Sequence, residues 1–92
     1  MSASSNGQLT RTVTLPDGVD LHARPAGALV RTAGAHSATI TLRSLGREAD
    51  AKSILQVLAL GATGGSTIEV ETSGDGSSQA LDAVSGLLQT LS

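Results

Sequence analysis

With 92 residues and no cysteine, the chain can form one small domain without disulfides, which fits a cytoplasmic protein. A net charge of −2 and the absence of Phe, Tyr and Trp argue against nucleic acid as a partner, since nucleic acids attract basic patches and aromatic stacking platforms. The N-terminus lacks a signal-peptide pattern and no apolar stretch approaches the roughly 20 residues of a membrane span, so membrane insertion is not expected.

The chain begins with a polar segment and a first strand. Residues 1–8, MSASSNGQ, are small and polar and predict a flexible tail, which leaves residues 9–92 for the folded domain. From Leu9 to Leu15, threonines alternate with larger side chains, and this period of two is typical of a strand. Pro16-Asp17-Gly18 follows and has the composition of a turn.

The first helix is predicted from Ala23 to Ala33. Pro25 fits its first turn, because the missing N–H of proline costs nothing there. Gly34 is typical of the residue that ends a helix. The apolar stripe that faces the core consists of Ala26, Leu29, Val30 and Ala33.

A hairpin is predicted next. Residues 37–45 alternate between apolar and polar side chains, which indicates a strand with one solvent-exposed face. Ser44-Leu45-Gly46 can turn the chain, and residues 47–51 then form the return strand.

The apolar run 54–60 follows, and its length fits either a short helix or a buried strand. Ser53 precedes the run and Gly61 ends it. Serine is a favoured N-cap and glycine a favoured C-cap, so a short helix is predicted.

The last elements are a strand and a helix. Residues 66–72 alternate again and predict a strand, and residues 73–76 form a turn. The final helix begins near Ser77, with an apolar stripe at Ala80, Leu81, Val84, Leu87, Leu88 and Leu91. Its predicted solvent face consists of Gln79, Asp82, Ser85 and Gln89. The order β-α-β-β-α-β-α predicts an α+β domain of two layers, with antiparallel strands and helices on one face.

The start of the first helix is the candidate functional site. Unpaired N–H groups and the positive end of the helix dipole favour an anion there, and phosphate in particular. His22 at this position can carry a phosphoryl group, held by the backbone of Ala23 and Arg24. The Arg24 guanidinium can add charge-assisted hydrogen bonds to the phosphate oxygens. The alternative is an ordinary exposed histidine beside an ordinary exposed arginine.

Two motifs resemble those of HPr, the histidine-containing phosphocarrier family of the bacterial phosphoenolpyruvate-dependent sugar phosphotransferase system. Leu21-His22-Ala23-Arg24-Pro25-Ala26 resembles the active-site signature, and Asp50-Ala51-Lys52-Ser53-Ile54-Leu55 with Leu60-Gly61 resembles the signature around a regulatory serine. The similarity runs from about Leu9 to Leu91. It implies an α+β open-faced β-sandwich, in which three helices cover one face of a four-stranded antiparallel sheet.

The resemblance also implies a function. Phosphorylated enzyme I would transfer a phosphoryl group to Nδ1 of His22, with Arg24 as charge partner, and His22 would donate it to enzyme IIA domains of sugar permeases. An HPr kinase/phosphorylase would phosphorylate Ser53, which by its own position is equally a helix cap. Partner docking is expected at Gly27, Ala28, Arg31, Lys52, Ile54, Leu55 and Leu58.

The expected protein is therefore a monomeric carrier within a phosphotransferase relay, not a stand-alone enzyme, and it needs no cofactor. Alternatives of the same fold are a carrier of a nitrogen-regulatory branch or of a dihydroxyacetone-kinase branch. An interaction module that has lost phosphotransfer is a third possibility, although His22 is present.

Two residues depart from the family pattern. Asp20 stands where glycine is common, and a requirement for positive φ would strain an aspartate there. Its charge would also lie near the phosphate and weaken its binding. His36 stands where an aromatic side chain is common. A metal site is not expected, because no cysteine and no second histidine accompany His36.

Overall fold

The computed structural model of the protein describes residues 8–91, and these form the predicted order of strands and helices. The strands are β1 (Leu9–Thr14), β2 (Thr39–Ser44), β3 (Arg47–Asp50) and β4 (Thr67–Ser73), and the helices are α1 (Ala23–Gly34), α2 (Ile54–Leu60) and α3 (Ser77–Thr90). Of the predicted tail 1–8, residues 1–7 lie outside the described residues. Gln8 is described, and its side-chain amide donates a hydrogen bond to Glu71.

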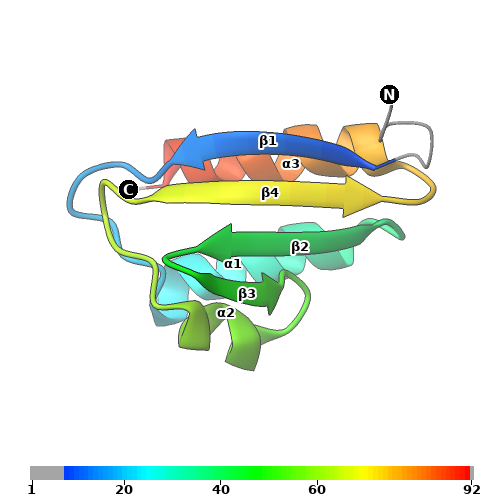
Figure 1. Ribbon diagram of the computed structural model, residues 1–92. Coiled ribbons are helices and arrows are strands. Elements are labelled where there is room, and N and C mark those ends of the chain that lie inside the picture. Colours follow the sequence, from blue (N-terminus) through cyan, green and yellow to red (C-terminus); the bar gives the residue numbers. More distant parts are fainter. Residues whose placement is uncertain (1–7, 92) are drawn as a thin grey trace.

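The four strands form one antiparallel sheet in the order β1-β4-β2-β3. Helices α1 and α3 pass behind this sheet and α2 lies beside β3, so that the opposite face of the sheet is uncovered (Figure 1). The predicted open-faced β-sandwich of the α+β class is confirmed.

The core between the layers contains no aromatic side chain and consists mainly of aliphatic ones. In β4, Ile68 and Val70 point into it, while Glu69 and Glu71, which alternate with them, point to the uncovered face. Thr72 is the next inward residue and is fully buried, and its hydroxyl is satisfied because Oγ1 donates to the Ser77 carbonyl at 2.9 Å. This bond also fixes the turn from β4 into α3.

The capping signals of α2 act as predicted. Ser53 is the N-cap, and its Oγ accepts a hydrogen bond from the Gln56 N–H at 3.3 Å. Gly61 ends the helix in the left-handed conformation at φ +66°, which glycine adopts without a steric penalty.

Two predictions about single residues need correction. Helix α1 ends one residue later than predicted, because Gly34 is its last helical residue and Ala35 is the C-cap in right-handed helical conformation. Ser85 does not lie on the solvent face of α3. It is buried, because α3 is covered by β1 and β4 on one side and by α1 on another, which widens its buried stripe. Leu45 lies in the hairpin turn, as predicted, and has φ +56°, a conformation that is unusual for a bulky residue.

An ion-pair network crosses the uncovered face of the sheet. Arg43 Nη1 lies 2.5 Å from Glu71 and 3.3 Å from Glu69, and Arg43 Nε lies 2.8 Å from Glu48. The hydrogen bond from Arg43 lowers the pKa of Glu71 below its usual value, and the amide of Gln8 lowers it further. The same contact with Glu71 raises the pKa of Arg43.

Candidate functional site

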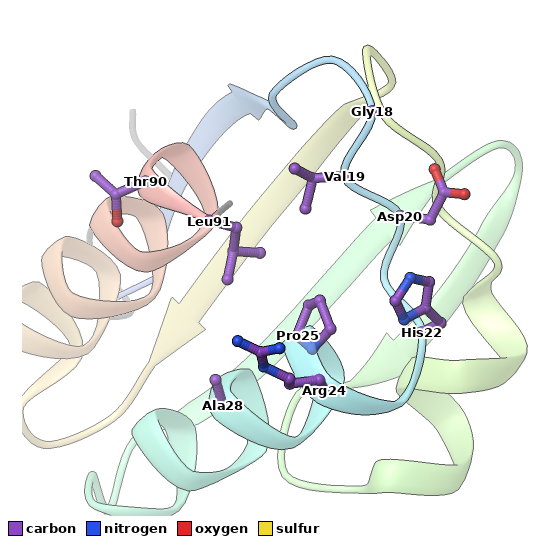
Figure 2. Close-up of a pocket in the computed structure, with 9 residues that line it drawn as sticks. All are labelled: Gly18, Val19, Asp20, His22, Arg24, Pro25, Ala28, Thr90 and Leu91. Atoms are coloured by element: carbon purple, nitrogen blue, oxygen red, sulfur yellow. The ribbon is translucent and has the colours of Figure 1, made fainter.

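The segment that leads into α1 buries Leu21 and leaves the candidate histidine at the surface. Leu21 is only 3% exposed and is anchored by its N–H, which donates to the Ala62 carbonyl at 2.9 Å. Its neighbours Asp20 and His22 are exposed to solvent. Figure 2 shows both side chains on the same side of this segment.

The loop that precedes β4 packs against this segment and is hydrogen-bonded to it. The Gly64 N–H donates to Asp20 Oδ1 at 2.8 Å. A Cβ atom on Gly64 would lie 2.5 Å from the Gly18 nitrogen and 2.8 Å from the Val19 nitrogen, so the two backbones are in direct contact. Only glycine leaves room for this approach. The sequence reasoning missed Gly64, and the Gly64-Gly65 pair inside a loop was its only signal.

Asp20 fits this backbone without the strain that was anticipated. Among the described residues other than glycine, only Leu45 has positive φ, so an aspartate at position 20 meets no left-handed requirement.

His22 is the N-cap of α1, and its imidazole makes no capping hydrogen bond. The His22 N–H donates to the Asp20 carbonyl at 2.9 Å, and the His22 carbonyl accepts from the Ala26 N–H at 2.8 Å. Pro25 has no N–H. The amides of Ala23 and Arg24 are then the two helix-start donors without an acceptor among residues 8–91. The exposed imidazole thus belongs to the residue next to two unpaired amides, at the positive end of a 12-residue helix.

Two shallow hollows meet at His22. One has a volume of about 320 Å³ and is lined by Gly18, Val19, Asp20, His22, Arg24, Pro25, Ala28, Thr90 and Leu91 (Figure 2). The other has a volume of about 270 Å³ and is lined by Asp20, Leu21, His22, Leu58, Gly61, Ala62 and Thr63. His22 and Asp20 belong to both, so the imidazole is reachable from the α3 side and from the α2 side.

The structure does not bring the Arg24 guanidinium onto the imidazole. Arg24 is exposed and extends along α1 toward Ala28, away from the His22 ring (Figure 2). It takes part in none of the ion pairs of the described residues. A phosphate on His22 would be met by Arg24 only after its flexible side chain turns back.

The predicted docking residues lie on α1 and α2, which are in contact with each other, except Lys52, which precedes α2. Val57 and Leu60 hold α2 to the core, and three apolar side chains face outward: Ile54 is 39% exposed, Leu55 76% and Leu58 40%. Because Leu58 lines the second hollow, this apolar surface is continuous with His22.

The basic residues predicted around this surface differ in exposure and in hydrogen bonding. Arg31 is exposed on α1, next to the half-buried Gly27 and Ala28. Lys52 is half-buried, and its Nζ donates to the His36 carbonyl at 2.7 Å, which ties the end of α1 to the segment before α2. His36 therefore has a structural role through its backbone, and Lys52 is already engaged.

Other kinds of site find no support in residues 8–91. No three His, Asp or Glu side chains are grouped as a metal site would require. In the same part of the chain, no helix combines the length and the apolar character needed to cross a membrane.

Comparison with known proteins gives a consistent result. A family model described as "PTS HPr component phosphorylation site" matches residues 9–90. The phosphocarrier protein HPr of Cupriavidus necator is 38% identical over 80 residues, which cover 87% of this chain and 90% of that protein. The phosphocarrier protein NPr of Proteus mirabilis is 36% identical over 81 residues, which cover 87% of this chain and 90% of that protein. The solved structure of a phosphocarrier protein HPr from Bacillus anthracis superposes with a TM-score of 0.86 at 31% identity, and the match covers 91% of this chain and 100% of that one.

Proposed function

The chain belongs to the HPr family of phosphocarrier proteins, and from this premise we propose a specific carrier cycle. His22 accepts a phosphoryl group from phosphorylated enzyme I and donates it to enzyme IIA domains of sugar permeases. The observation that carries the proposal is the exposed imidazole of His22, free of capping bonds, beside the unpaired amides of Ala23 and Arg24.

The transfer is a direct displacement at phosphorus by the imidazole of His22. The lone pair of His22 Nδ1 forms a bond to phosphorus while the bond between phosphorus and the donor breaks, and that electron pair returns to the donor. Delivery to the acceptor runs the same exchange in the opposite sense. The amides of Ala23 and Arg24 are already oriented by the helix, so they stabilise charge on the phosphoryl oxygens without reorganisation.

Arg24 has the second role in this cycle. When His22 carries the phosphoryl group, its negative charge attracts the guanidinium from its position along α1 toward the ring. Arginine suits this task because its planar fork can donate to two oxygens at once. Loss of Arg24 should therefore slow transfer without abolishing it.

Partner enzymes dock on the apolar surface of α2. Ile54, Leu55 and Leu58 form its centre, and Ala28, Arg31 and Lys52 form its edge toward α1. Burial of such a surface favours association, while the continuity through Leu58 brings the partner's active site to His22.

Ser53 is the proposed regulatory phosphosite, modified by an HPr kinase/phosphorylase. It caps α2 beside the docking surface, so a phosphate there places about two negative charges where a partner binds. We expect Ser53→Asp to slow transfer from enzyme I with little change in melting temperature. Unchanged transfer would limit Ser53 to its capping role.

A carrier of a nitrogen-regulatory branch is the second candidate. It is favoured by the relative named phosphocarrier protein NPr, whose identity of 36% is close to the 38% of the HPr relative. The two candidates share the chemistry at His22 and differ in the acceptor protein. Side-by-side transfer to an enzyme IIA domain of each branch separates them, and faster transfer to the sugar-branch domain supports the first.

The histidine assignment is tested by labelling. The protein is incubated with enzyme I and labelled phosphoenolpyruvate, and the label should be acid-labile and base-stable, as expected for phosphohistidine. His22→Ala should abolish labelling with the fold intact. His36→Ala is the matched control, since the chain has two histidines, and it should label normally. Full labelling of His22→Ala would overturn the assignment.

A further inference from the structure

We propose that Asp20 sets how readily His22 gives up its phosphoryl group, an inference that rests on the proposed carrier function. Asp20 and His22 flank the buried Leu21, both are exposed, and their side chains lie on the same side of the segment (Figure 2). Both line both of the hollows that meet at the site. Asp20 is therefore the acidic residue of both hollows that open at His22.

The carboxylate is held in this place. Its Oδ1 accepts the Gly64 N–H at 2.8 Å, and Gly64 belongs to a loop that touches the Gly18 and Val19 backbone. The Asp20 carbonyl also accepts the His22 N–H at 2.9 Å, so the residue is fixed at both its backbone and its side chain. These two bonds restrain the position of its charge next to the segment that carries His22.

The charge of Asp20 is not neutralised within the described structure. None of the ion pairs of residues 8–91 includes Asp20. Arg24 lines one of the same hollows, but its guanidinium extends along α1, away from the His22 ring (Figure 2).

A phosphorylated His22 carries added negative charge, and the fixed carboxylate repels it. The repulsion raises the free energy of the phosphorylated protein relative to the unmodified one. The equilibrium with the donor enzyme is then shifted toward the unmodified carrier, and the same term favours delivery to an acceptor. At the ionic strength of a low-salt buffer, one charge near an exposed phosphate corresponds to about a two- to fourfold change in this equilibrium.

Asp20→Asn isolates the charge, because the asparagine side-chain oxygen can still accept the Gly64 N–H. Asp17→Asn is the matched control. It removes the same charge from the same loop, at a residue that lines neither hollow. The measurement is the equilibrium ratio of phosphorylated to unmodified protein with phosphorylated enzyme I, at low salt and at about 0.5 M salt.

Asp20→Asn should raise the equilibrium constant for phosphorylation about two- to fourfold at low salt and much less at high salt, whereas Asp17→Asn should leave it unchanged. Asp20→Ala should show the same rise together with a lower melting temperature, since it also loses the bond to Gly64. An unchanged or lower constant for Asp20→Asn, or an effect in Asp20→Ala alone, would overturn the inference. Failure of the wild-type protein to take label at His22 would instead remove the proposed function on which it rests.

Discussion

Gly64→Ala tests whether the loop before β4 positions the phosphoryl site. A Cβ atom at this position would lie 2.5 Å from the Gly18 nitrogen, 2.8 Å from the Val19 nitrogen and 2.9 Å from the Pro16 carbonyl oxygen. All three atoms belong to backbone, so no side chain can rotate out of the way. The segment 16–22 has to move, and it carries His22.

The cost follows from this geometry. Forcing one methyl group into a tightly packed contact costs about 1–3 kcal/mol, and the upper half of that range applies because the neighbours are backbone. For a domain of this size a loss of about 2 kcal/mol lowers the melting temperature by roughly 10 °C. A displacement of the reacting group by a fraction of an ångström should also slow phosphorylation by about tenfold.

Thermal unfolding followed by circular dichroism gives the stability, and the rate of phosphorylation by enzyme I gives the second readout. Gly86→Ala is the matched control, because a Cβ there meets nothing within 4 Å and the residue lies inside α3. It should stabilise the protein by up to about 1 kcal/mol and leave the rate unchanged. If Gly64→Ala unfolds and is phosphorylated like the wild type, the support assigned to this loop is refuted.

Three further predictions concern the core, the sheet and the docking surface. Ser85→Ala should raise the free energy of unfolding by about 1 kcal/mol, since it removes a buried Oγ without a partner among the described residues; a loss in urea titrations would contradict this. The lowered pKa of Glu71 stabilises the fold above the usual glutamate pKa of 4.5, and this stability is lost as pH falls through the lower folded-state value. Glu71→Gln should therefore be less stable than the wild type at pH 7 and nearly equal to it at pH 2. Leu55→Gln should raise the KM for transfer from enzyme I about tenfold without changing the melting temperature, whereas Leu45→Gln, 65% exposed on the hairpin turn, should leave the KM unchanged.

Local chemistry made much of this molecule predictable from its sequence. Ser53 and Gly61 signal the two ends of α2 by their own capping preferences, and the observed cap bond and left-handed glycine follow from them. Pro25 signals the start of α1, because its missing N–H costs nothing in the first turn. Strand alternation likewise fixed which face of β4 is buried.

Features that depend on distant neighbours could not be predicted in this way. Ser85 is buried because α3 is enclosed by elements from three parts of the chain, which no helical period reveals. The contact of Gly64 with Gly18 joins residues that are 46 positions apart in the sequence. The hydrogen bond from the Gly64 N–H to Asp20 joins residues that are 44 positions apart. The direction of the Arg24 side chain is also not encoded in its position beside His22.

The central claim is that the start of α1 holds a phosphoryl group on His22 with the amides of Ala23 and Arg24. Backbone NMR spectra of ¹⁵N-labelled protein, recorded before and after phosphorylation by enzyme I, test it directly. We expect phosphorus on an imidazole nitrogen of His22 and the largest downfield amide proton shifts at Ala23 and Arg24. Phosphorus on His36, or on His22 with these two amide resonances unmoved, would contradict it.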